Sequence, residues 1–140
     1  MGYRRQAREL VVQSLYGYDL NRQNRGEALA RFRETAHLPE KAFRFAEELF
    51  AGVIDHLEEI DRRIDGHARN WTLDRLALVD KQILRLALCE LYYREDIPPP
   101  VTINEAVEIA KKFSTPQSGR FVNGILDRVR EEMEADDGRS

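Results

Sequence analysis

The chain has 140 residues, 42% of them hydrophobic, and a formal net charge of −3. That length suits one domain, and that apolar content supports a folded core, which excludes a disordered chain. The only cysteine, Cys89, excludes an internal disulfide and a cysteine-based metal cluster. Because we find neither a signal peptide nor an apolar run long enough to cross a membrane, we expect a cytoplasmic protein without a membrane partner.

The charge is unevenly distributed. Residues 1–25 contain five arginines against two acids, whereas residues 131–140 contain five acids against one base. Arginine supplies 18 of the 22 basic residues, and its planar guanidinium suits bidentate phosphate contacts. A GC-rich genome, which uses arginine codons often, would explain the same excess of arginine over lysine. The net charge therefore does not exclude nucleic acid as a partner.

Hydrophobic periodicity predicts helices throughout the first half of the chain. One helix is expected from Arg4 to Leu20 and a short one from Glu27 to Ala36. From Pro39 to about Ala68 the apolar spacing fits one long helix or two, with Gly52 as a weak point. A turn near Asn70 would follow.

The second half begins with a segment from Leu76 to Tyr93 that is apolar nearly all round, as a buried central helix is. Thr72 or Asp74 could cap it. The sequence Thr102 to Glu105 has the pattern of a capping box ahead of the next helix. Pro116 can open the last helix. We therefore expect one compact all-α domain of six to seven helices, packed as two small bundles, with an acidic, frayed tail over residues 131–140.

No catalytic or metal-binding motif stands out. There is no glycine-rich phosphate loop, and the carboxylate pairs are typical of solvated helix faces. Glu34 and His37 have the spacing of a di-iron ligand pair, but such a site needs a second copy of the motif and two further carboxylates. We expect no enzyme activity, no metal and no cofactor.

The first helix combines arginines with an aromatic ring. At 100° per residue Arg5 and Tyr16 differ by only about 20° around the axis. This combination suits single-stranded RNA, because guanidinium groups neutralise phosphates and an aromatic ring stacks on a base. An ordinary solvated basic helix start would show the same pattern. In the last helix Gln117, Phe121 and Gly124 share one face, where Phe121 is either core or a stacking ring.

Four segments resemble the NusB family of bacterial transcription antitermination factors. They are RRQARELVVQSLY at 4–16, ILRLALCEL at 83–91 with Ile97-Pro98 following, VTINEAVEIAKKF at 101–113 and SGRFVNGILD at 118–127. They occur in the family order, and the resemblance covers about residues 3–130. It implies two packed three-helix bundles, with halves of about 1–70 and 71–130 in a single domain spanning 1–130.

The resemblance also implies partners and contact residues. The partners are the single-stranded boxA RNA of ribosomal RNA leaders, the ribosomal protein NusE, other Nus factors and RNA polymerase; a homodimer is left open. Transferred by position, the RNA-contacting residues are Arg4, Arg5, Arg8, Tyr16, Asp80, Lys81, Gln117, Ser118 and Phe121. Three departures from the family pattern, Gln6, Gln117 and Gly119, affect the RNA contacts rather than the fold.

Two alternatives remain at this stage. One is a helical adaptor that binds protein partners and has no RNA affinity of its own. The other is a stand-alone relative of the guide domain of ribosomal RNA cytosine methyltransferases. Such a guide domain is expected to precede a catalytic domain that binds a methyl donor.

Overall fold

The computed structural model describes residues 2–21, 25–67 and 76–139. In these ranges the chain forms seven helices and no strand, which confirms the all-α prediction. They are α1 (Tyr3–Asn21), α2 (Arg25–Ala36), α3 (Glu40–Asp55), α4 (Leu57–His67), α5 (Leu78–Tyr93), α6 (Pro99–Phe113) and α7 (Pro116–Arg139). The predicted turn near Asn70 and the predicted caps Thr72 and Asp74 lie outside the described residues.

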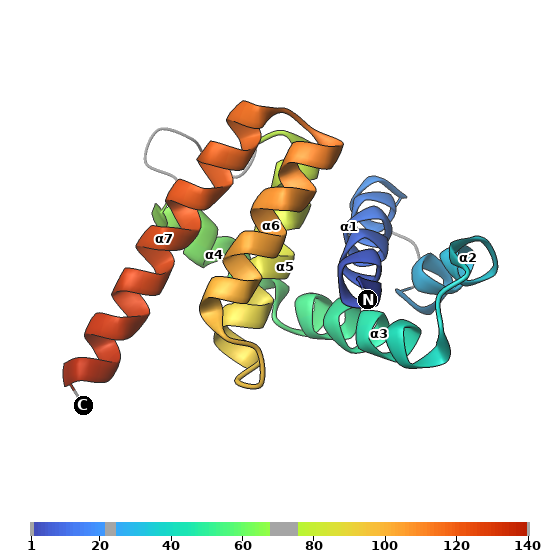
Figure 1. Cartoon of the computed structure of the whole chain (residues 1–140), viewed down its shortest axis with the longest axis horizontal. Helices are drawn as coiled ribbons and strands as arrows, with labels where there is room; N and C mark the ends of the chain where they lie inside the picture. Colours follow the sequence, from blue (N-terminus) through green and yellow to red (C-terminus); the bar gives the residue numbers. More distant parts are fainter. Residues whose placement is uncertain (1, 22–24, 68–75, 140) are drawn as a thin grey trace.

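The helices form two groups. Helices α1, α2 and α3 pack on one another, and α5, α6 and α7 form the second bundle. Figure 1 shows the first group to one side of the molecule, with α7 on the opposite side. Helix α4 contacts α5 more than it contacts α3, and it also contacts α7. Among the described residues no helix is long and apolar enough to span a membrane.

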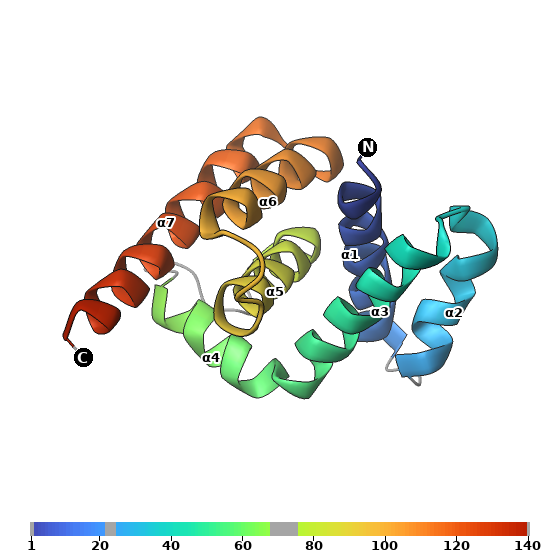
Figure 2. The same cartoon turned by 60° about the horizontal axis from the view of Figure 1, so that its bottom comes forward.

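The break between α3 and α4 falls at His56 rather than at Gly52. The His56 backbone N–H and ring Nδ1 both lie within hydrogen-bond distance of the Gly52 carbonyl oxygen, at 3.2 and 3.0 Å. The ring also stacks on Tyr93 of α5, with the ring centres 3.8 Å apart. The chain turns the corner around α5 at this point, as Figure 2 shows.

Helix α6 begins earlier than the predicted capping box. It starts at Pro99, because a proline at the first helical position has the required φ and lacks only an N–H that would be unpaired anyway. Thr102 and Glu105 therefore lie inside the helix, where their side chains bond to other helices. The predicted capping box is wrong, although the helix predicted to follow it is present.

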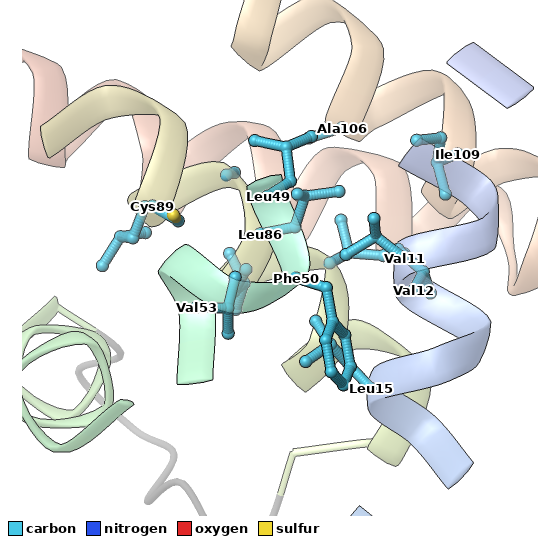
Figure 3. Packing of buried hydrophobic residues seen from close by; sticks show 14 of the residues in the cluster. Val11, Val12, Leu15, Leu49, Phe50, Val53, Leu86, Cys89, Ala106 and Ile109 are labelled. Atoms are coloured by element: carbon cyan, nitrogen blue, oxygen red, sulfur yellow. The ribbon is translucent and has the colours of Figure 1, made fainter. Parts of the chain in front are cut away.

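The core lies where α1, α3, α5 and α6 meet. Figure 3 shows the apolar side chains of these helices converging, among them Val11, Leu49, Leu86 and Ile109. Helix α5 is buried almost along its whole length, as its sequence predicts, and several of its polar residues are buried too. One of these, Arg85, forms two 2.8 Å bonds to Asp61 and so docks α4.

Most of the acidic tail belongs to the last helix in the structure. Helix α7 continues to Arg139, and Arg130 pairs with Glu134 one turn further on at 3.2 Å. Such i, i+4 pairs support exposed helices. In Figure 1 this end of α7 projects away from α1.

Close packing of α3 on α5 at Gly52 gives a stability test. A Cβ atom at Gly52 would lie 3.0 Å from Cys89 Sγ, which is buried. In Gly52→Ala the usual helical gain of about 1 kcal/mol over glycine is offset by this contact. In a Cys89→Ala background that gain should be recovered. Urea unfolding of the four proteins measures the coupling, and equal effects of Gly52→Ala in both backgrounds would contradict it.

Candidate nucleic-acid interface

Three of the residues predicted to contact RNA are exposed along α1. Arg4 is exposed, Arg5 leaves 44% of its side chain accessible, and Tyr16 is 38% exposed. The guanidinium carbon of Arg4 lies 4.5 Å from the centre of the Phe45 ring, a cation–π contact that holds its side chain against α3. At 1.5 Å per residue Arg5 and Tyr16 lie about 16 Å apart along the axis. Helix α1 thus presents basic groups near one end and an aromatic ring toward the other.

Arg8 is buried, unlike the three residues above. It is only 2% exposed, and its Nε and Nη2 atoms donate to the two carboxylate oxygens of Glu90 at 2.8 and 3.0 Å. The Thr102 hydroxyl donates to the same carboxylate at 2.8 Å. This pairing holds the Arg8 guanidinium in the core, away from the exposed groups of α1, and its contact with RNA phosphate stays a prediction. Its position on the core side of α1 makes it a structural link from α1 to α5, and through Glu90 to α6.

Carboxylates of α1 and α6 partly neutralise the basic groups. Arg5 Nε donates to Glu105 at 2.7 Å, and Lys112 Nζ donates to Glu9 at 2.6 Å. The hydrogen bond to Glu105 raises the pKa of Arg5 above its ordinary value. A groove of about 520 Å³ between the two helices is lined by Gly2, Arg5, Gln6, Glu9, Glu105 and Lys112.

Lys112 is a basic group that sequence reasoning missed. It leaves 60% of its side chain exposed beside the groove. Its place in the last turn of α6 could be read from the sequence, but the packing of α6 against α1 could not. Lys112 therefore joins Arg4 and Arg5 as a candidate phosphate contact.

Asp80 and Lys81 begin α5 near the far end of α1. Lys81 is largely buried, with Nζ 3.8 Å from Asp19 of α1. Asp80 is 6% exposed and accepts a hydrogen bond from the Ser118 hydroxyl at 3.1 Å. Burial raises the pKa of Asp80 above its ordinary value, although the hydroxyl groups of Ser118 and Ser114 act in the opposite direction.

The start of α7 completes a pocket with the start of α5. Its volume is about 420 Å³, within the range of small-ligand sites. It is lined by Leu76, Ala77, Asp80, Thr115, Gln117, Ser118 and Phe121. The structure therefore brings together four of the predicted residues: Asp80, Gln117, Ser118 and Phe121. Phe121 is half-buried and packs against the core, so it serves the core at least in part, and its stacking on a base stays a prediction.

Two glycines of α7 differ in their surroundings. A Cβ atom at Gly119 would lie 3.1 Å from Lys111 Cγ, so the absence of a side chain lets α7 approach α6. Nothing lies within 4 Å of the corresponding position at Gly124. Close helix packing therefore explains Gly119 and does not explain Gly124.

The fold and this surface define a class of protein: an all-helical, two-bundle domain that exposes arginines, a tyrosine and a small pocket with both apolar and polar lining residues. The chain belongs to the NusB family, whose family model matches residues 5–131. It is 47% identical over 137 residues to the transcription antitermination protein NusB of Geobacter sp. (strain M21), covering 92% of this chain and 94% of that protein.

Solved structures agree with this assignment. T. maritima NusB superposes with a TM-score of 0.85 at 40% identity, covering 92% of this chain and 91% of that one. A crystal structure of the antitermination factors NusB and NusE in complex with dsRNA gives a TM-score of 0.86 at 32% identity, with coverages of 94% and 98%.

The buried carboxylate of Asp80 predicts a pH-dependent stability. Because its pKa is raised in the folded state, protonation favours folding: stability falls as the pH rises from the ordinary value through the folded pKa, and the full cost of the ionised group remains above it. Asp80→Asn keeps an acceptor for Ser118 and should raise the unfolding free energy at pH 7. That gain should shrink as the pH falls toward 3.8, the ordinary value. Urea titrations at several pH values measure it, with exposed Asp127→Asn as control; a gain that does not depend on pH would contradict it.

Proposed function

We propose that this chain is a transcription antitermination factor that binds single-stranded boxA RNA of ribosomal RNA leaders together with NusE. The observation that carries the proposal is the exposure of Arg4, Arg5 and Tyr16 on one helix of a NusB-family fold. The guanidinium groups would neutralise phosphates, and the ring would stack on a base. The role is binding in the cytoplasm, as part of a larger complex with other Nus factors and RNA polymerase, and it needs no catalytic group.

The ion pairs of the groove bear on affinity. Arg5 and Lys112 already have carboxylate partners, so RNA phosphates must compete with Glu105 and Glu9. Few net charges are then available, and for single strands the salt slope is about −0.7 for each neutralised phosphate. The proposal therefore includes a shallow salt dependence and an affinity to which NusE contributes.

Substitutions on α1 test the proposal. Arg5→Ala should weaken boxA binding about fivefold and reduce the salt slope by about 0.7, because one phosphate contact is lost. Tyr16→Ala should weaken binding about tenfold through lost stacking, whereas Tyr16→Phe should retain most of it. Fluorescence anisotropy with labelled boxA and scrambled RNA, with and without NusE, measures the affinities, and circular dichroism checks that helicity is unchanged.

Two controls separate RNA contact from indirect effects. Arg62→Ala removes an equally charged, exposed side chain from α4 and should leave binding unchanged. Glu105→Gln frees Arg5 and should strengthen binding; weaker binding would mean that Arg5 acts only by pairing with Glu105. Wild-type affinity for boxA no greater than for scrambled RNA would overturn the proposal. Normal NusE binding without any RNA binding would identify a protein-binding adaptor instead.

A further inference from the structure

A pocket lies between α2 and α3, on the side of the molecule away from α7 (Figure 2). Its volume is about 210 Å³, and its floor is apolar, since Leu29, Phe43 and Phe50 are only 6%, 4% and 2% exposed. All the residues that line it belong to α2 or α3, and none of them is among the candidate RNA contacts. The pocket is therefore a second candidate site, separate from the surface described above.

The size of the pocket limits what it can hold. Ala30 of α2 is exposed and Ala51 of α3 is half-buried where the two helices line the pocket, and their methyl groups are too short to close it. A dry apolar cavity of about 150 Å³ holds a benzene ring, whereas sites for drug-sized ligands start at about 300 Å³. At about 210 Å³ the pocket has room for one large apolar side chain but not for a nucleotide or a large cofactor.

Two charged side chains line the pocket, and they differ in their partners. The Arg33 guanidinium carbon lies 4.6 Å from the centre of the Phe43 ring, and Arg33 Nη2 lies 2.9 Å from a Glu40 carboxylate oxygen. Glu47 is exposed, and within the described part of the chain its carboxylate has no ion pair or hydrogen bond. A ligand in the pocket therefore meets one negative charge that is not neutralised, and a cation beside the apolar group complements it.

A helix brings an apolar anchor and a cation together at the required spacing. Grooves between helices accept the apolar face of a further helix, whose anchoring side chains recur one turn apart. Glu47 itself lies one turn after Phe43 and one turn before Phe50, both of which form the floor. A residue one turn from the anchor of an incoming helix can therefore reach the Glu47 carboxylate.

We propose that the α2–α3 pocket docks a short amphipathic helix of a partner protein. This helix inserts one aromatic or leucine side chain into the pocket and pairs a lysine or arginine with Glu47. The inference goes beyond RNA binding and does not depend on it, because it uses no residue of the candidate RNA surface. It gives the chain a second binding face, on the helix pair that α1 covers from the other side.

Peptide selection tests the inference. A displayed library of helical peptides is selected on the immobilised full chain, and the selected peptides should carry an aromatic or leucine residue with a lysine or arginine one turn away. The best of them is labelled with a fluorophore and titrated with variants. Ala30→Leu, which fills the pocket, should weaken binding about a hundredfold through loss of a buried anchor. Glu47→Lys should weaken it about tenfold, because attraction becomes repulsion.

Charge exchange provides the matched control. A peptide whose basic residue is replaced by glutamate should bind Glu47→Lys more tightly than it binds the wild type. Glu58→Lys, which reverses an exposed charge on α4, should leave binding of the selected peptide unchanged. Circular dichroism and urea unfolding check that Ala30→Leu is folded.

Four results would overturn the inference. They are failure to select any peptide, selected peptides without a basic residue, equal binding to the wild type, Ala30→Leu and Glu47→Lys, and displacement of the peptide by boxA RNA, which would place RNA in the groove. A wild-type chain that dimerises where Ala30→Leu stays monomeric would also overturn it, since a second copy would then be the occupant. Failure to bind RNA would overturn the proposed function alone.

Discussion

The buried pair between Arg8 and Glu90 is the interaction on which the arrangement of α1 depends. Both side chains are almost wholly removed from solvent, at 3% and 1% exposure, and Thr102 adds a third partner. Removing one member of such a pair typically costs about 3–5 kcal/mol, because the other charge is left buried and uncompensated. The pair tolerates little rotation of α1, since two parallel hydrogen bonds fix its geometry. It therefore determines which side of α1 faces solvent.

The exposed surface follows from this constraint. With Arg8 turned inward, Arg5 and Tyr16 face outward, and Glu105 of α6 is brought within reach of Arg5. The same contact between α1 and α6 places Glu9 beside Lys112. Basic groups and carboxylates thus alternate along the groove, so an anionic ligand must compete with Glu105 and Glu9 for Arg5 and Lys112. The net charge of −3 is uninformative here, because the acidic excess lies on the far end of α7.

Sequence reasoning recovered what depends on local periodicity. The helices, the buried α5 and the proline at the start of α7 could all be predicted. Contacts between helices do not follow from local pattern: Arg8 pairs with Glu90, which lies 82 positions further along the chain. Thr102 and Glu105 had the pattern of a cap but serve as partners of Glu90 and Arg5. The resemblance points to Asp80, Gln117, Ser118 and Phe121, whereas the pocket that they line together requires coordinates.

In our proposal, α1 buries Arg8 in the core and exposes Arg4 and Arg5 for contact with RNA. Titration of boxA RNA into ¹⁵N-arginine-labelled protein, observed through the side-chain Nε–Hε signals, tests it most directly. We expect the signals of Arg4 and Arg5 to shift with RNA, while that of Arg8 stays in place and remains slow to exchange with solvent. A shift of the Arg8 signal as large as that of Arg5, or no shift of Arg5, would contradict the account.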